Sequence, residues 1–210
     1  MWFEEVVKPR LKGRAFLVRY ADDFVMGFAC EEDARRVLDV LPKRFGKYGL
    51  TIHPDKTRLV PFGRPGARPS LTRSTAESPP GSFDFLGFTH YWSRSKKGPW
   101  VVKRKTAGSR FQRAVKTIAT WCRRNRHLPL GEQHRVLSLK LRGHYAYYGG
   151  VIGNACCLQR FRYEVQRLWQ QWLSRRKRRG SFPWARLNHW LRRCPLPWPP
   201  YWVPPLVVNP

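Results

Sequence analysis

The spacing of hydrophobic residues changes partway along the chain and predicts two parts. Residues 15–20 and 24–30 are apolar and rich in aromatic and β-branched side chains, which favour strands, and two acidic residues lie between them. Residues 31–46 carry apolar side chains every three or four positions after an acidic first turn, which predicts an amphipathic helix. Residues 49–63 predict an extended piece, a Pro-Asp turn and a second strand.

The rear part is predicted to be mostly helical. Residues 64–82 are rich in Pro, Gly, Ser and Arg and predict a mobile surface loop. Strand patterns resume at 83–92 and 100–105, and from about residue 109 the period becomes helical. Helices are expected over 109–122, 132–148, 154–176 and 184–193, with an extended tail from Pro195. The fold class predicted is α+β: a small antiparallel sheet with a helix, followed by an α-helical bundle.

The charge of the chain is strongly positive and unevenly distributed. Hydrophobic residues make up 42%, enough for a packed core, and the net charge is +28 with a pI of about 11.1. Residues 1–62 hold 12 Lys/Arg against 9 Asp/Glu, whereas residues 63–210 hold 29 against 4. Such a field favours a polyanionic partner, nucleic acid before membrane.

Cysteine usage and hydropathy indicate a cytoplasmic protein without a membrane partner. The five cysteines are odd in number and fit no zinc spacing, so reduced thiols are expected. No apolar run approaches 18 residues, and Glu4 and Glu5 stand where a signal peptide needs basic residues.

The acidic pair between the first two strands is the main candidate for chemistry. Asp22 and Asp23 follow Tyr20 and Ala21, so a hairpin turn would present two carboxylates at the tip of a sheet. Mg²⁺ takes oxygen ligands of this kind, and paired metal ions catalyse phosphoryl transfer in polymerases and nucleases. The alternative is that the pair is only a hydrophilic turn.

Four sequence blocks follow one another in an order that points to a family. They are RYADDF (19–24), GLTIHPDKTR (49–58), FLGF (85–88) and LRGHY (141–145) with Tyr147, Tyr148 and Asn154 beyond it. The first three resemble the fifth, sixth and seventh conserved blocks of group II intron reverse transcriptases. The fourth is similar to the maturase-specific region, or thumb, and Trp169 and the stretch 184–190 continue it.

The resemblance implies RNA-directed DNA synthesis at a Mg²⁺ site and binding of the parent intron RNA to assist its splicing. It implies a partial palm at 1–92 and a basic hairpin with a helical thumb/maturase domain at 93–210. It implies metal-binding Asp22 and Asp23, and Lys56 near the leaving group, although a strand-edge Lys is more often a solvated charge. RNA template and DNA primer are the implied substrates, with primer contacts from Tyr20, Ala21, Phe85, Leu86 and Gly87. Ordinary strand packing explains Phe85 to Phe88 equally well.

Basic and aromatic side chains of the rear part are the candidates for RNA contact, because Arg and Lys bind phosphates and aromatic rings stack on unpaired bases. The expected set is Lys103, Arg104, Lys105, Arg110, Arg113, Arg142, His144, Tyr147, Arg175, Arg176, Arg178 and Arg179. Phe161, Trp169 and Trp172 occur at helical spacing and are instead expected in the core.

The sequence departs from the family pattern upstream of the acidic pair. The family carries a third catalytic Asp on an earlier strand, and here only Glu4 and Glu5 precede the pair. The chain therefore resembles the C-terminal half of a longer enzyme. We expect Leu17, Phe24 and their neighbours to leave an open apolar edge that self-associates or takes a complementary N-terminal reverse transcriptase fragment.

Three interpretations remain open on the sequence alone. The chain is a polymerase segment that is active only with its missing half, a maturase-like RNA-binding module in which the Asp pair is a relic, or a gene remnant without function.

Overall fold

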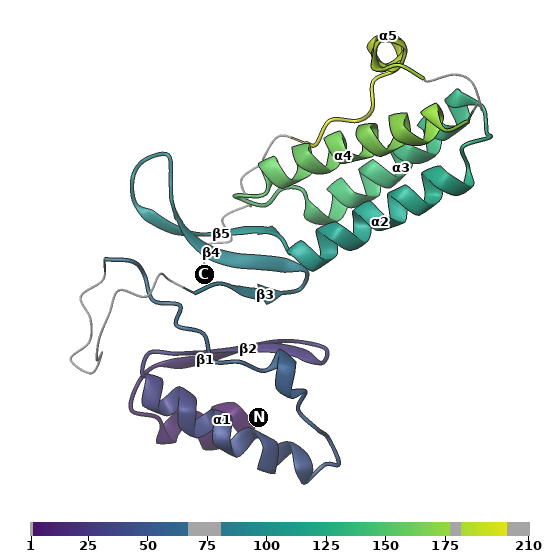
Figure 1. Ribbon diagram of the computed structural model, residues 1–210. Helices are drawn as coiled ribbons and strands as arrows, with labels where there is room; N and C mark the ends of the chain where they lie inside the picture. Colours follow the sequence, from purple (N-terminus) through teal and green to yellow (C-terminus); the bar gives the residue numbers. More distant parts are fainter. Residues whose placement is uncertain (1, 67–80, 177–181, 201–210) are drawn as a thin grey trace. The chain divides into compact units, whose positions relative to one another are not determined.

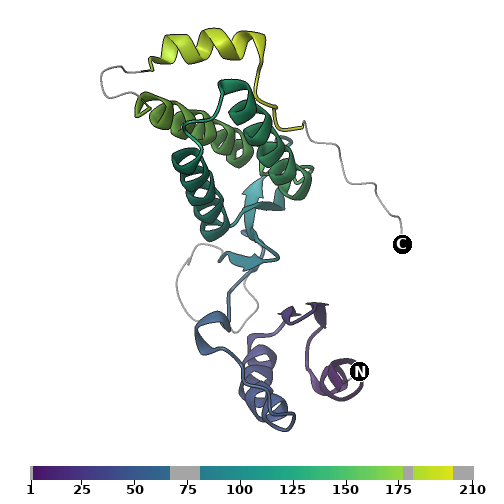
Figure 2. The ribbon, with the colours of Figure 1, turned by 90° about the vertical axis from the view of Figure 1, so that its right-hand side faces the viewer.

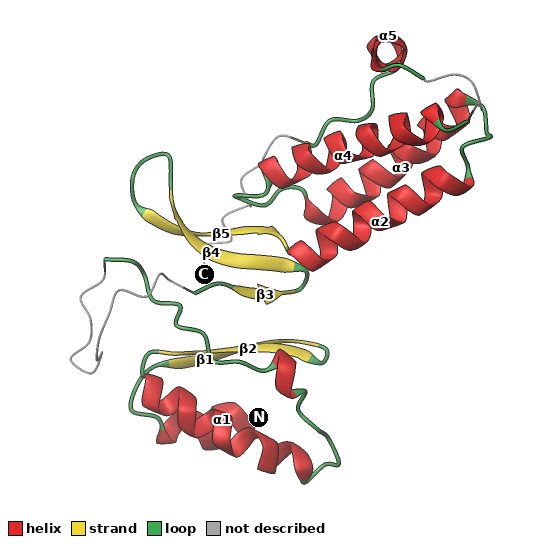
Figure 3. Cartoon of the chain, viewed as in Figure 1, coloured by secondary structure: helices red, strands yellow, loops and turns green. Residues whose placement is uncertain are grey.

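The computed structural model describes residues 2–66, 81–176 and 182–200. The chain forms two compact units, Met1–Leu86 and Gly87–Pro210, which are described separately below. Along the chain, the boundary between them falls between Leu86 and Gly87, within the FLGF block. The sequence predicted a domain boundary after Trp92. Most of the loop predicted at 64–82 lies outside the described residues. The α+β class is as predicted, with small antiparallel sheets first and helices after them (Figure 3).

Unit 1 is built around one hairpin and one helix (Figure 1). Two short helical turns, Phe3–Val7 and Lys8–Arg10, precede antiparallel strands β1 (Ala15–Tyr20) and β2 (Asp23–Phe28). Helix α1 spans Glu31–Gly46, a single turn spans Pro54–Lys56, and β3 spans Phe83–Phe85. The second strand expected near residues 57–63 is wrong, since this stretch is irregular. Pro61 lacks the N–H that a paired strand position would donate.

The hairpin buries one face against the helical elements of its unit. The Phe24 ring stacks on Phe45 of α1 at 6.0 Å between centroids, and Phe28 meets Phe3 edge to face. Leu17 pairs with Met26 and is half-buried on this same face. Leu17 and Phe24 are therefore covered by their own unit, while β1 and β2 pair only with each other among the described strands and so keep open edges.

Strand alternation places a different set of side chains on the outer face of the hairpin. Successive side chains point to opposite faces, so the neighbours of Leu17 face outward. Phe16, Val18 and Tyr20 are 59%, 48% and 65% exposed. These neighbours of Leu17 thus supply an exposed apolar surface on the outer face of the hairpin.

A buried carboxylate fixes the start of the hairpin. Asp33, in the first turn of α1, is 1% exposed, and its Oδ2 accepts the backbone N–H groups of Lys12 and Gly13, both at 2.9 Å. Those two residues lie three and two positions before Ala15, the first residue of β1. The carboxylate therefore satisfies two backbone donors that no strand partner would reach.

Over its described residues, unit 2 is a β-hairpin followed by four helices. Strands β4 (Phe88–Arg94) and β5 (Trp100–Thr106) pair antiparallel. Helices α2 (Gly108–Arg124), α3 (Leu130–Tyr148) and α4 (Ala155–Ser174) lie side by side, and α5 (Trp184–Arg193) crosses them (Figure 2). All four lie close to their predicted positions. None of the described helices is both long and apolar enough to cross a membrane.

The core of unit 2 lies among the helices. Leu137 and Leu141 of α3, Val165 and Trp169 of α4 and Leu187 of α5 have no exposed surface. The indole N–H of Trp169 donates to the side-chain oxygen of buried Gln133 at 2.8 Å. Gln133 in turn donates to the Leu128 carbonyl at 2.7 Å, so this polar pair is satisfied inside an apolar core.

One fully buried amide joins the hairpin to the helices. The Asn154 carbonyl oxygen accepts the Thr106 backbone N–H at 2.7 Å, and its amide group donates to the Tyr148 carbonyl at 2.8 Å. The amide also exchanges hydrogen bonds with the Thr106 hydroxyl at 3.0 and 3.1 Å. Asn154 thereby ties the end of β5 and the end of α3 to the start of α4.

We expect Asn154→Ala to lower the free energy of unfolding by about 3 kcal/mol, because it leaves a backbone N–H and a carbonyl buried without partners. Asn188→Ala, at an exposed position of α5, serves as the control and should change it by about 0.5 kcal/mol or less. Urea denaturation of the full chain measures both. Equal effects would show that the Asn154 bonds do not stabilise the fold.

Candidate functional site

A two-residue turn presents the acidic pair at the tip of the β1–β2 hairpin. Tyr20 pairs with Asp23, so only Ala21 and Asp22 form the turn. Ala21 has a φ of +52°, a left-handed value that costs a residue with a Cβ on the order of 1 kcal/mol. Arg19 Nε donates to the Ala21 carbonyl at 2.7 Å and braces this conformation. Strain of this kind is common at functional sites.

Both carboxylates of the pair are exposed to solvent. Directly paired residues share a face of a sheet, so Asp23 points to the same side as Tyr20, the outer face that also carries Val18. Carboxylate oxygens fit Mg²⁺ by donor type. Among the described residues, however, no three His, Cys, Asp or Glu side chains gather as a metal site would require. The pair fits part of a Mg²⁺ site and is short of ligands for a whole one.

Lys56 lies in a separate turn from the acidic pair. It is exposed at the end of the Pro54–Lys56 turn, and no hydrogen bond or ion pair in the described part of unit 1 connects it with Asp22 or Asp23. Its predicted place beside a leaving group remains an expectation.

The FLGF block forms a strained turn at the junction of the units. Leu86 and Gly87 both have positive φ, +49° and +78°, as the two central residues of a type I′ turn require. In unit 2, the Gly87 carbonyl accepts the Ala107 N–H at 2.9 Å, and a Cβ on Gly87 would lie 3.2 Å from the Tyr148 hydroxyl. Gly87 therefore lies at a bend and has a close side-chain neighbour. Phe85 and Leu86 are half-buried.

Some basic residues of β5 and α2 interact with other groups of the protein, and others are exposed to solvent. Lys103 donates to the Arg94 carbonyl at 2.8 Å, within its own hairpin, and the Lys105 ammonium lies 5.0 Å from the centre of the Tyr91 ring. Arg104, Arg110 and Arg113 are exposed.

The candidates on the other helices differ in how far they reach into solvent. Arg142 is exposed, and Tyr147, 58% exposed, stacks on Phe88 at 5.8 Å between centroids. Arg175 lies over the Trp172 ring, and Arg176 donates to the His127 carbonyl at 2.6 Å. Arg178 and Arg179 lie outside the described residues.

His144 faces the interior of unit 2. Its ring stacks on Phe161 at 4.0 Å and lies 4.6 Å from the Tyr148 ring, and its Nε2 atom is buried with no hydrogen-bond partner in the described structure. Burial lowers the pKa of His144 from 6.5 to about 4. The imidazole is therefore neutral at neutral pH and packs as an aromatic side chain.

The three aromatic residues that the sequence predicted to lie in the core are buried to different extents. Phe161 and Trp169 are 2% and 0% exposed, which confirms the prediction, and Trp172 is half-buried. The rings of Phe161 and Trp169 are therefore not available to stack on bases.

A polar row on α3 was not among the site residues predicted from the sequence. His134, Ser138 and Arg142 stand four residues apart, a spacing that puts them on one face of a helix. That signal was present in the sequence, but the segment they face, at residues 194–200, is far along the chain and carries no motif.

Comparison with known proteins assigns the first part of the chain. Residues 3–90 match the family model of reverse transcriptase (RNA-dependent DNA polymerase). This segment contains the acidic pair at the hairpin tip and the FLGF turn, and it is a reverse transcriptase family domain. No curated protein matches the chain.

We expect acid to destabilise unit 2 through His144. The folded pKa lies below the unfolded one, so the unfolded state binds the additional proton as the pH falls from about 6.5 to about 4, and the free energy of unfolding falls over that window by about 2 kcal/mol, after an allowance for partial exposure. His144→Phe keeps an aromatic ring and removes the titration. Urea unfolding across this pH range should show a shallower fall for the variant, and parallel curves would contradict the assignment.

Proposed function

We propose that this chain is part of a group II intron reverse transcriptase/maturase that binds intron RNA and contributes two carboxylates to a polymerase metal site. The observation that carries the proposal is the exposed Asp22–Asp23 pair at a hairpin tip within a reverse transcriptase family domain. The RYADDF, FLGF and LRGHY blocks support the intron-specific part of it.

The polymerase role rests on Mg²⁺, which reverse transcriptases use. When bound, the metal stabilises the charge that develops on the transferred phosphoryl group. In this chain Asp22 and Asp23 would hold the metal. They lie at a turn in which Ala21 has a left-handed backbone conformation and Arg19 donates a hydrogen bond to the Ala21 carbonyl. Because the described residues supply no third ligand of the metal-binding types beside them, we propose that a further carboxylate comes from a complementary reverse transcriptase fragment.

The RNA-binding role rests on the charge of unit 2. Between residues 87 and 210 the sequence holds 26 Lys/Arg and only two acidic residues, Glu132 and Glu164. Glu164 is already paired with Arg167 at 2.8 Å. The exposed guanidinium groups of Arg110 and Arg113 on α2 and of Arg142 on α3 are thus left to contact phosphates.

A stand-alone RNA-binding module is the second candidate, and the incomplete ligand set around Asp22 and Asp23 favours it. The two candidates agree on unit 2 and differ on whether the acidic pair is used. Catalysis by the acidic pair and binding by the basic unit therefore need separate tests.

For catalysis, we expect no primer extension on an RNA template by the chain alone with Mg²⁺, because two carboxylates under-ligate the metal pair. Adding a fragment with the upstream palm strands should restore extension, and Asp22→Ala with Asp23→Ala should then reduce it by at least about 100-fold. Asp39→Ala, at an exposed position of α1, is the matched control and should leave extension unchanged.

Two outcomes would contradict this account. Extension by the chain alone that the double variant abolishes would show that the pair is catalytic without a third carboxylate from elsewhere. Restored extension that survives the double variant would remove the acidic pair from the mechanism.

For binding, we expect RNA affinity to fall steeply with salt. If about six phosphates are neutralised, the slope of log affinity against log salt is about −4 for single-stranded RNA. Arg110→Ala with Arg113→Ala should reduce that slope by about 1.4, since each residue loses one phosphate contact. Arg167→Ala serves as the control, because its guanidinium is already paired. Fluorescence anisotropy with labelled RNA measures the slopes, and salt-insensitive affinity would overturn RNA binding.

A further inference from the structure

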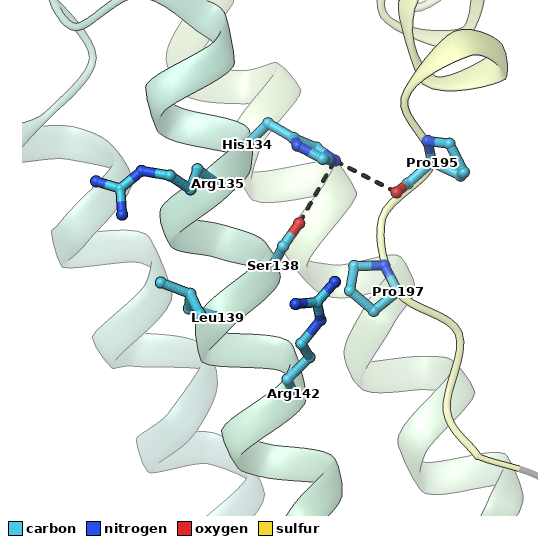
Figure 4. Close-up of a pocket in the computed structure, with 7 residues that line it drawn as sticks. All are labelled: His134, Arg135, Ser138, Leu139, Arg142, Pro195 and Pro197. Atoms are coloured by element: carbon cyan, nitrogen blue, oxygen red, sulfur yellow. Dashed lines mark hydrogen bonds between the residues drawn. The ribbon is translucent and has the colours of Figure 1, made fainter.

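An open pocket of about 300 Å³ lies between α3 and the segment 194–200, which we call the strap (Figure 4). The strap follows α5 and lies along α3, with Leu196 buried at 1% exposure. His134, Ser138 and Arg142 of α3 line one side of the pocket, and Pro195 and Pro197 of the strap line the other. The pocket is therefore built from elements more than 50 residues apart in the sequence.

The carbonyl groups of the strap are engaged by donors from the helices. The Pro195 carbonyl lies 3.3 Å from His134 Nε2, the Leu196 carbonyl accepts from Arg162, and the Pro197 carbonyl accepts from the Tyr145 hydroxyl at 3.3 Å. Burial raises the pKa of Tyr145 to about 12, so this hydroxyl keeps its proton. These hydrogen bonds between strap carbonyl groups and helix side chains therefore hold the strap against the helices.

The helix side of the pocket offers donors. His134 Nε2 lies 3.3 Å from the Pro195 carbonyl and 3.4 Å from the Ser138 oxygen. A carbonyl only accepts, so the bond to Pro195 requires the proton on Nε2. That proton is then shared with the Ser138 oxygen, and the Ser138 hydroxyl proton is free to point into the pocket.

Arg142 supplies the charge. Its guanidinium extends toward Pro197, on the pocket side of α3, whereas Arg135 turns its guanidinium away (Figure 4). Among the described residues no hydrogen bond or ion pair engages Arg142, and no carboxylate lines the pocket. An unpaired guanidinium beside a free hydroxyl is a donor set for an anion that accepts two or more hydrogen bonds.

We propose that this pocket binds a backbone phosphate of RNA, with the Arg142 guanidinium and the Ser138 hydroxyl as donors. The proposal rests on the RNA-binding function proposed above and gives it one defined contact. Phosphate oxygens match the planar fork of Arg, and the strong positive charge of unit 2 draws a polyanion to this surface. A free phosphate ion offers the same oxygens, so the test separates the two sources.

The test measures binding of a labelled single-stranded RNA to the full chain by fluorescence anisotropy over a range of chloride concentrations. Arg142→Ala should weaken binding by about 10-fold and reduce the salt slope by about 0.7, the value for one phosphate. Ser138→Ala should weaken it by about 3-fold with the slope unchanged, since it removes a neutral donor. Arg124→Ala, at an exposed position of α2 away from the pocket, is the matched control and should cost about 2-fold or less.

Arg142→Lys keeps the charge and loses the fork, so it should keep the salt slope and recover only part of the affinity. Arg142→Lys also serves as a control for a folding defect. The thermal unfolding temperature of each variant is a second control and should match that of the parent, because Arg142 is exposed. Equal effects of Arg142→Ala and Arg124→Ala would overturn the pocket.

The remaining outcomes separate this proposal from the function beneath it. A parent chain that fails to bind RNA would remove the proposed function and the pocket contact together. RNA binding with no special loss in Arg142→Ala would remove only the pocket. Inorganic phosphate that displaces RNA better than chloride at equal ionic strength, from the parent but not from Arg142→Ala, would assign the pocket to the free ion and overturn the RNA contact.

Discussion

Buried backbone groups must find hydrogen-bond partners, and in each unit one side chain meets that requirement at the point where the elements join. In unit 1, Asp33 accepts the N–H groups that precede β1 and so fixes the hairpin to α1. In unit 2, Asn154 binds the end of β5, the end of α3 and the start of α4. The tip that presents the acidic pair and the helices that present the basic surface both depend on these contacts.

The two units carry opposite kinds of chemistry. Unit 1 ends its hairpin in two exposed carboxylates on a strained turn, which suits a hard cation. Unit 2 holds nearly all the excess positive charge, which suits phosphates. The function proposed above needs both, because a metal site that acts on a nucleic acid requires a second surface to hold that nucleic acid. The assignment at residues 3–90 places the carboxylates within that family, and the basic unit extends well beyond the matched segment.

Packing decides which side chains of unit 2 can reach a ligand. His144 and Tyr147 are three residues apart on α3, yet His144 stacks on Phe161 inside the bundle and Tyr147 is exposed beside Phe88. Residue type did not separate them, since both are aromatic and both belong to the same motif. Arg142 and Lys103 differ in the same way, because Lys103 donates to its own hairpin and Arg142 faces an open pocket.

The sequence by itself determined the α+β class, the β1–β2 hairpin, the helices and the candidate carboxylates, because period, charge and turn chemistry are local properties. It misplaced the strand at 57–63, a stretch that contains a Pro without a backbone N–H, and it did not settle which face of β1 is exposed. Only the tertiary structure decided that face, the burial of His144 and the pocket between α3 and the strap. Each depends on residues distant in sequence, and no local pattern encodes which of them come into contact.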